Sequence, residues 1–198
     1  MAAVTYEFPA QQVSDAAIIR ESCRLPERFA GIFDRYYGQV HDYAARRLGQ
    51  HLADDVAAET FLIAFTLRGR YDLSRANARP WLFGITSNLI SRHHRSEARR
   101  YTAMARARVS EVDAGHAEQV DARIDAESQR TCLASALARI READRDVLLL
   151  IAWAGLTSAE AGEALRIPAG TARSRLHRAR NQIRGALTPC RSIIGEDN

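Results

Sequence analysis

Hydrogen-bonding side chains recur at helical spacing near the C-terminal end, where residues 169–187 contain five arginines and no acid. On a helical wheel, one narrow stripe of this segment is apolar and consists of Ala172, Leu176, Ala179 and Ile183. The opposite face carries Ser174, His177, Arg178 and Asn181, and it is flanked by Arg173 and Arg175. A hydroxyl, an imidazole and a forked cation can bind base edges in a major groove, while flanking arginines bind phosphates. The pattern favours a DNA-binding helix over the alternative, a solvated amphipathic helix.

A second basic stripe lies in residues 78–100. The amide of Asn88 heads a run of arginines at three-and-four spacing, which consists of Arg92, Arg95 and Arg99. Such a stripe suits a nucleic-acid backbone and one base contact. The neighbouring His93 and His94 point about 100° apart on a helix and have no third ligand at metal spacing, so no metal site or cofactor is expected. A nuclease that uses these histidines would also need paired carboxylates, which are missing beside them.

Charge is partitioned along the 198-residue chain, although its net charge is only +4. All 28 basic residues are arginine. Ten arginines against two acids lie between residues 68 and 108, six acids against one arginine lie between 110 and 127, and six arginines without an acid lie between 170 and 191. Alternation of basic, acidic and basic stretches indicates two polyanion-binding modules joined by an acidic connector.

These side chains need helices to position them, and the apolar spacing predicts an all-α chain. Core-facing helices are expected at 29–48 and 78–100. The segment 53–67 is apolar almost all the way round, so it is either buried on every side or docks on a partner. Further along, Thr157 and Glu160 fit a capping box, and Pro168 suits the first turn of a following helix. That order is typical of a helix-turn-helix.

The fold class that follows is all-α, with two small helical domains joined by an acidic flexible linker. The expected divisions are an N-terminal extension without an assigned role, a first domain, the linker, a helix-turn-helix domain and a tail, at residues 1–26, 27–102, 103–125, 126–190 and 191–198. No apolar run reaches the roughly 20 residues of a membrane span, and the N-terminus lacks the layout of a secretory signal. A cytoplasmic protein is therefore expected.

Three stretches together resemble the RNA polymerase sigma factors of bacteria, in particular the extracytoplasmic-function (ECF) group, which retains regions 2 and 4. They are "DDVAAETFLIAF", "PWLFGITSNLISRHHRSEARR" and "ADRDVLLLIAWAGLTSAEAGEALRIPAGTARSRLHRARNQIRGAL". The resemblance covers about 29–102 and 126–187, in the family's order. It implies a non-enzymatic transcription initiation factor, whose partners are promoter DNA and the β′ clamp helices and β flap of core RNA polymerase.

The resemblance also implies residue roles. Contacts with the polymerase core fall to Asp54, Asp55, Glu59, Phe61 and Leu62. Capture of melted −10 bases and binding of nearby phosphates fall to the loop 72–77 with its Asn77, and to Asn88, Arg92, Arg95, Arg99 and Arg100. Readout of the −35 duplex falls to Thr171, Arg173, Ser174, Arg175, His177 and Arg178.

The chain departs from the family's pattern at one place, and two questions about its function and partners stay open. The family usually has Glu-Ile-Ala where this chain has Glu160, Ala161 and Gly162, so a looser region 4, or a neighbour that fills the gap, is expected. A stand-alone helix-turn-helix regulator would instead be a dimer that binds duplex DNA by itself. The sequence also leaves open whether an anti-sigma factor binds the chain.

Overall fold

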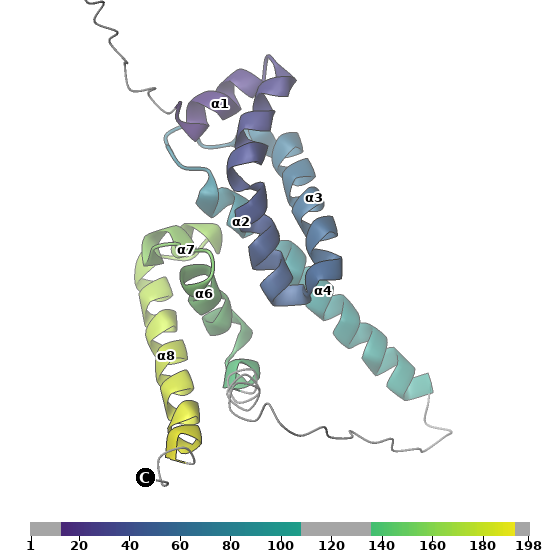
Figure 1. Ribbon diagram of the computed structural model, residues 1–198, viewed down its shortest axis with the longest axis vertical. Coiled ribbons are helices and arrows are strands. Elements are labelled where there is room, and N and C mark those ends of the chain that lie inside the picture. Colours follow the sequence, from purple (N-terminus) through teal and green to yellow (C-terminus); the bar gives the residue numbers. More distant parts are fainter. Residues whose placement is uncertain (1–12, 108–135, 193–198) are drawn as a thin grey trace, which may run out of the picture.

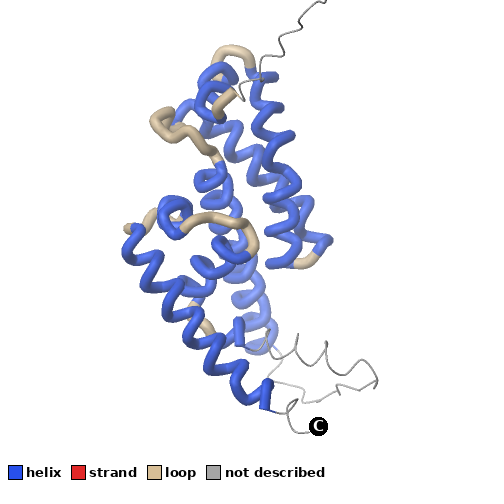
Figure 2. The backbone as a smooth tube through the Cα atoms, turned by 60° about the vertical axis from the view of Figure 1, so that its left-hand side comes forward, coloured by secondary structure: helices blue, strands red, loops and turns tan. Residues whose placement is uncertain are grey.

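The computed structural model describes residues 13–107 and 136–192, and every regular element in these ranges is helical (Figure 2). The α-helices are α1 (Asp15–Ser22), α2 (Ala30–Leu48), α3 (Gln50–Leu67), α4 (Arg79–Ala107), α6 (Glu142–Ala152), α7 (Ser158–Ala164) and α8 (Ala169–Ser192). Two 3-10 turns, η1 (Pro26–Phe29) and η2 (Arg68–Arg70), precede α2 and follow α3. The all-α expectation is confirmed. No described helix is long and apolar enough to cross a membrane.

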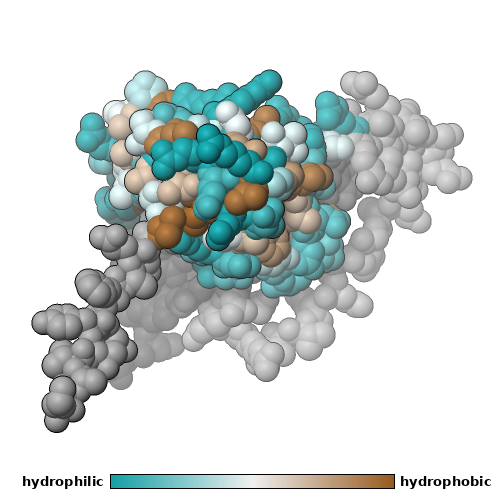
Figure 3. Space-filling model, turned by 90° about the horizontal axis from the view of Figure 1, so that it is seen from above, coloured by the Kyte–Doolittle hydropathy of each residue, from teal (hydrophilic) through white to brown (hydrophobic). Residues whose placement is uncertain are grey.

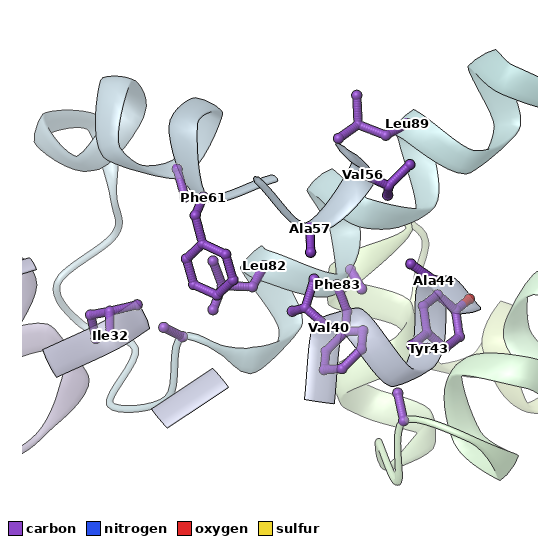
Figure 4. Packing of buried hydrophobic residues seen from close by; sticks show 14 of the residues in the cluster. Ile32, Val40, Tyr43, Ala44, Val56, Ala57, Phe61, Leu82, Phe83 and Leu89 are labelled. Atoms are coloured by element: carbon purple, nitrogen blue, oxygen red, sulfur yellow. The ribbon is translucent and has the colours of Figure 1, made fainter. Parts of the chain in front are cut away.

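Helices α2, α3 and α4 form a bundle in the N-terminal half (Figure 1). The turn between α2 and α3 is made at Gly49, whose φ of 88° lies in the left-handed region that glycine adopts without steric cost. Side chains from all three helices meet in one core (Figure 4). The ring of Tyr43 meets that of Phe83 edge to face, with 5.4 Å between the ring centroids. Ile32, Val40 and Tyr43 of α2 thus face the core, as their spacing predicts, whereas Phe33 is exposed.

Most of the apolar side chains of helix α3 are buried or partly buried, which favours the first of the two alternatives for this segment. Val56, Ala57 and Ala64 are fully buried, because α3 packs between α2 and α4. Phe65 meets Phe29 edge to face, with ring centroids 5.4 Å apart. The main exception is Leu62, which is 65% exposed. A nearly all-round apolar helix is therefore mostly core here, and only a narrow part of it is left for a partner.

The N-terminal helix α1 belongs to the same bundle. Ser14 caps it by accepting a hydrogen bond from the Ala17 N–H, and its residues Ile18 and Ile19 are buried in the common core. The expected division at residue 27 therefore falls between α1 and the core that this helix helps to form. With only one adjacent pair of large apolar residues, α1 shows too little periodicity for its burial to be predicted.

Helices α6, α7 and α8 form the second unit. The expected apolar stripe of α8 is buried against α6, where Ala172, Leu176 and Ala179 pack on Val147 and Leu148. Before α7, the capping box is confirmed. The Thr157 hydroxyl accepts from the Glu160 N–H at 3.2 Å, and the Glu160 carboxylate accepts from the Thr157 N–H at 2.8 Å.

The turn between α7 and α8 explains the unusual glycine in this helix. The Ile167 N–H donates to the Gly162 carbonyl at 2.8 Å. A Cβ on Gly162 would stand 2.9 Å from the Ile167 carbonyl oxygen, closer than Cβ atoms come to other groups. The backbone of the turn thus fills the space that a side chain at residue 162 would occupy.

The two units pack against each other, whereas the sequence predicts separate domains with separate cores. Leu150 and Ala161 belong to the same buried cluster as Phe83. Helix α4 approaches α7 so closely that a Cβ on Gly84 would lie 2.6 Å from the Ala164 carbonyl oxygen. The acidic linker is expected at 103–125, but residues 103–107 belong to α4, because the helix continues past the end of the first domain; residues 108–125 lie outside the described residues.

A buried ion pair crosses this contact. Arg47 of α2 donates to Asp146 of α6 at 2.9 Å, and the two side chains are only 4% and 11% exposed. The Arg79 guanidinium donates to the Ala154 carbonyl at the end of α6. The contact between the units therefore includes buried polar interactions as well as an apolar core.

Candidate functional site

The exposed side of α2 and α3 carries a small aromatic cluster beside Leu62. Phe33 stacks on Tyr37, with 4.8 Å between ring centroids, and is itself 41% exposed. Phe61 lies beneath them, 4.9 Å from the Phe33 ring and only 5% exposed. Of the residues expected to meet a polymerase, Leu62 is therefore at the surface, while Phe61 supports the surface from below.

Of the expected acidic contacts of α3, Asp54 touches this cluster. Asp54 accepts from the Tyr37 hydroxyl at 3.2 Å and lies 3.3 Å from the His41 Nε2. Asp55 is exposed, whereas Glu59 pairs with Arg92 of α4 at 2.5 Å. One residue expected to bind polymerase and one expected to bind DNA thus hold each other.

The loop between η2 and α4 carries Asn77. The side-chain oxygen of Asn77 accepts from the Arg79 N–H at 2.9 Å, so the amide nitrogen is turned outward. This nitrogen donates to Glu160 of α7 at 3.1 Å, and Arg75 in the same loop forms an ion pair with Glu163. Two acids of α7 therefore occupy hydrogen-bonding groups of the loop in which base capture is expected.

A cavity of about 280 Å³ lies where this loop, α4 and α7 meet. Its lining includes Tyr71, Trp81 and the exposed Asn88. The Tyr71 and Trp81 rings are 5.0 Å apart, and burial raises the pKa of Tyr71 to about 12. The cavity therefore joins Asn88 to the loop that ends at Asn77, whereas Asn77 itself lines a different cavity.

The arginine stripe of α4 extends away from the cavity along the exposed face. Arg92, Arg95 and Arg99 are exposed, and Arg95 donates to the Ser91 carbonyl of its own helix at 3.1 Å. The side chain of Arg100 lies outside the described residues. The described arginines present cations on one side of α4, as their spacing predicts.

On α8, the face opposite the buried stripe is open to solvent. Ser174, His177 and Arg173 are exposed, and Thr171 and Arg175 are partly exposed. The His177 ring nitrogen lies 2.9 Å from the Asn181 amide. The polar side chains expected to read a duplex thus share an accessible helix face.

Arg178 is the exception on this face, because it also holds the unit together. It makes two hydrogen bonds to Asp144 of α6, at 2.8 and 3.2 Å, although the Asp144 side chain is only 2% exposed. These bonds, with help from Arg141, lower the pKa of Asp144, and the Asp144 carboxylate in turn raises the pKa of Arg178. A residue expected to read bases therefore also fixes the recognition helix on its scaffold.

Several polar contacts around these surfaces could not be predicted from the sequence. They are the bonds between Arg47 and Asp146, between the Ala78 N–H and Asp15, and between Arg79 and the Ala154 carbonyl. Each bond joins residues that are far apart in the sequence, so no local spacing signals it. Within the described residues, no group of three His, Cys, Asp or Glu side chains could hold a metal ion.

Comparison with known proteins decides the family. Residues 32–100 match sigma-70 region 2, and residues 130–183 match sigma-70 region 4. The ECF RNA polymerase sigma factor SigC of Mycobacterium tuberculosis is 30% identical over 139 residues, which cover 69% of this chain and 71% of SigC. The chain belongs to the ECF sigma factors. It is an alternative sigma factor that directs RNA polymerase to promoters, and a stand-alone regulator is not favoured.

Other relatives of this sigma factor agree. SigW of Bacillus subtilis, also an ECF sigma factor, is 29% identical over 81% of this chain and 89% of SigW. The fold is similar to that of CnrH in its complex with the cytosolic domain of CnrY, with a TM-score of 0.62 and 22% identity over 87% of this chain and 96% of CnrH. The family assignment therefore rests on sequence, and the shared fold is consistent with it.

Proposed function

We propose that the α3 surface is where this sigma factor binds the β′ clamp helices of core RNA polymerase. The support is the exposed Leu62 beside the aromatic cluster of Phe33 and Tyr37, with Asp54 and Asp55 at its edge. An exposed apolar anchor with a polar rim is typical of a protein interface. Phe61 supports this anchor from below, and Glu59 contributes once it leaves Arg92.

The loop 72–77 and helix α4 form the proposed −10 site. Asn77 and Asn88 hydrogen-bond melted bases, and phosphates are bound by Arg92, Arg95, Arg99 and Arg100. The observation that carries this proposal is that one cavity is lined by Asn88 of α4 and by Asp72 and Arg75 of the loop that ends at Asn77. Amide groups can bind the edge of an unstacked base, while arginines neutralise the backbone.

The exposed face of α8 is the proposed −35 reader. Its contacts come from Thr171, Arg173, Ser174, Arg175, His177 and Arg178, while the unit as a whole binds the β flap. Residues 27–102, together with α1, and residues 126–190 act as the two working domains, and the part of 103–125 beyond the end of α4 acts as the linker. The polymerase carries out all of the catalysis, in the cytoplasm, and this chain contributes no reaction of its own. We include an anti-sigma factor among the partners.

Transcription with purified core polymerase on genomic fragments tests this assignment. Leu62→Asp should reduce co-purification with core on the order of tenfold, because a charge at an apolar contact opposes binding. Leu25→Asp is the matched control, since Leu25 is 44% exposed but lies outside α3. Equal effects of the two variants, or tight binding of a duplex by the chain alone, would contradict the proposal.

A further inference from the structure

A buried carboxylate links three parts of the bundle beneath the proposed −10 loop. Asp15, at the start of α1, is 4% exposed. Its Oδ1 accepts from Arg35 at 2.8 Å, and its Oδ2 accepts from the Tyr36 hydroxyl at 2.6 Å and from the Ala78 N–H at 2.8 Å. Asp15 thus connects α1 and α2 to the residue immediately before α4.

The Ala78 N–H is one of the donors that the start of a helix leaves without an intrahelical partner. Ala78 is fully buried, so this N–H cannot be satisfied by water without local opening. A carboxylate at this place satisfies the donor and also suits the positive end of the α4 dipole. Asp15 therefore fixes where the loop ends and where α4 begins.

The orientation of Asn77 follows from this anchor. Asn77 directly precedes Ala78, and its side-chain oxygen is held by the Arg79 N–H at 2.9 Å and lies 3.5 Å from the Tyr36 hydroxyl. The Arg79 N–H is next to the Ala78 N–H, which donates to Asp15, and the Tyr36 hydroxyl itself donates to Asp15. Because the oxygen is used inside the protein, only the amide nitrogen is presented outward, where it meets Glu160.

The Tyr36 hydroxyl acts as a donor in this arrangement. Burial, together with its hydrogen bond to Asp15, raises the pKa of Tyr36. The hydroxyl therefore keeps its proton, which lies toward the Asp15 carboxylate at 2.6 Å. A cavity of about 400 Å³ beside it is lined partly by Ser14, Asn77 and Arg79, so apolar packing does not fill this side of the loop. On this side the end of the loop is held by the polar contacts of Asp15, while Glu160 and Glu163 of α7 also contact the loop.

We propose that Asp15 is a positioning residue for −10 recognition, which holds Asn77 so that its amide nitrogen faces the captured base. This rests on the proposed role of Asn77. It also assigns a role to the N-terminal segment, because α1 carries the carboxylate that orders the recognition loop.

A purely structural role in anchoring α1 is the alternative, and Ser14 separates the two. Ser14→Ala removes the N-cap of α1, whose hydroxyl accepts from the Ala17 N–H at 3.3 Å, without removing a donor or acceptor bonded to Asp15. Asp15→Asn keeps the size of the side chain but replaces one oxygen with a donor, which opposes at least one of the three donors around it. Tyr36→Phe removes one donor and leaves the Asp15–Arg35 ion pair intact.

The experiment is transcription by the reconstituted holoenzyme on promoter fragments randomised in both the −35 and the −10 element, followed by sequencing of the transcripts. Asn77→Ala should flatten the base preference at one −10 position. Asp15→Asn should flatten the same position about fivefold, the value of roughly one ordinary hydrogen bond, and Tyr36→Phe should do so by a smaller factor. The −35 preference should be unchanged in each variant, and Ser14→Ala should retain both preferences.

Three outcomes would contradict either the proposed role of Asn77 or that of Asp15. If Asn77→Ala leaves every −10 preference unchanged, the proposed role of Asn77 is wrong. If Asn77→Ala flattens a position that Asp15→Asn and Tyr36→Phe leave unchanged, only the role of Asp15 is wrong. If Ser14→Ala flattens that position as strongly as Asp15→Asn, Asp15 acts through the folding of α1 alone.

Discussion

The two units of this sigma factor each place a buried aspartate under the element expected to contact DNA, but in different ways. In the second unit, Asp144 binds the reading side chain itself, Arg178, and both belong to that unit. In the first unit, Asp15 binds the backbone at Ala78 and leaves the outward groups of the loop to others. Those groups, on Asn77 and Arg75, are bound by acids of α7.

One of the two proposed DNA-binding surfaces is therefore accessible as it stands, whereas the other is covered by the neighbouring unit. The face of α8 is exposed in the same arrangement in which Glu160 and Glu163 occupy the loop. The α3 surface with Leu62 is exposed as well. The proposed −35 and polymerase contacts can therefore form while the units are packed together, whereas the proposed −10 contacts require α7 to leave.

The largest effect on the contact between the two units should come from Asp146→Ala. It leaves the Arg47 side chain, only 4% exposed, as an unpaired buried cation, a loss worth about 3–5 kcal/mol in other buried pairs. Separation of the units lets Arg47 reach water, so we expect the units to part. Small-angle scattering should then report a larger radius of gyration.

The double variant Arg47→Met with Asp146→Leu provides the control. Replacement of a buried ion pair by apolar side chains of similar volume is commonly neutral or stabilising. The double variant should therefore scatter like the wild-type protein. An unchanged radius of gyration in Asp146→Ala would show that the pair does not hold the units together.

Gly84→Ala should have the next largest effect, because its Cβ would stand 2.6 Å from a backbone oxygen of α7. Overpacking of this kind costs about 1–3 kcal/mol. Hydrogen exchange in α7 and in the loop 72–77 should become faster. Gly38→Ala is the matched control, since nothing lies within 4 Å of that position on α2. Slow exchange in α7 of the Gly84 variant would mean that the contact tolerates a methyl group.

Arg178→Ala tests whether the bond between Arg178 and Asp144 stabilises the second unit. It should lower the free energy of unfolding by about 1–3 kcal/mol, because it leaves the buried Asp144 with the exposed Arg141 as its remaining partner. It should also weaken use of the −35 element by about 1–3 kcal/mol. Arg173→Ala should weaken −35 use yet change stability by less than about 0.5 kcal/mol. Denaturant titration and run-off transcription separate the two effects, and equal stability losses would remove the distinction.

The smallest expected effect is in the pH dependence. The folded protein lowers the pKa of Asp144, so the carboxylate stabilises the fold above the unfolded pKa of about 3.9, and this stabilisation is lost as the pH falls through the lower folded value. The difference in unfolding free energy between wild type and Asp144→Asn should be constant near neutral pH and shrink below about pH 4. A difference that stays constant through acid pH would exclude this linkage.

The sequence was most informative where its signals are local. Apolar periodicity placed α2 and α8, and the Thr157 capping box placed the start of α7. The burial of α1 and the contact between Gly84 and Ala164 could not be predicted, because they depend on which surfaces meet in space. For the same reason Arg178 was expected to be a free reader, since nothing in the spacing of α8 reveals Asp144 beneath it.

Helix α4 connects the recognition loop at one end to the start of the linker at the other, and its far end projects beyond the bundle (Figure 1). Leu89 and Ile90 are buried in the common core and Arg92 pairs with Glu59 of α3, so α4 is held against the bundle as far as Arg92, and about 22 Å of helix extends past that point. A bend of about 10° there would move the tip by roughly 4 Å, by the geometry of a rod of that length. A small bend in α4 beyond Arg92 is thus magnified at the end of the helix, where the chain continues toward the second unit. Figure 3 shows the opposite end of the molecule, which carries α1, as a mainly hydrophilic face with separate hydrophobic spots. The projecting end of α4 lies on the other side of the molecule.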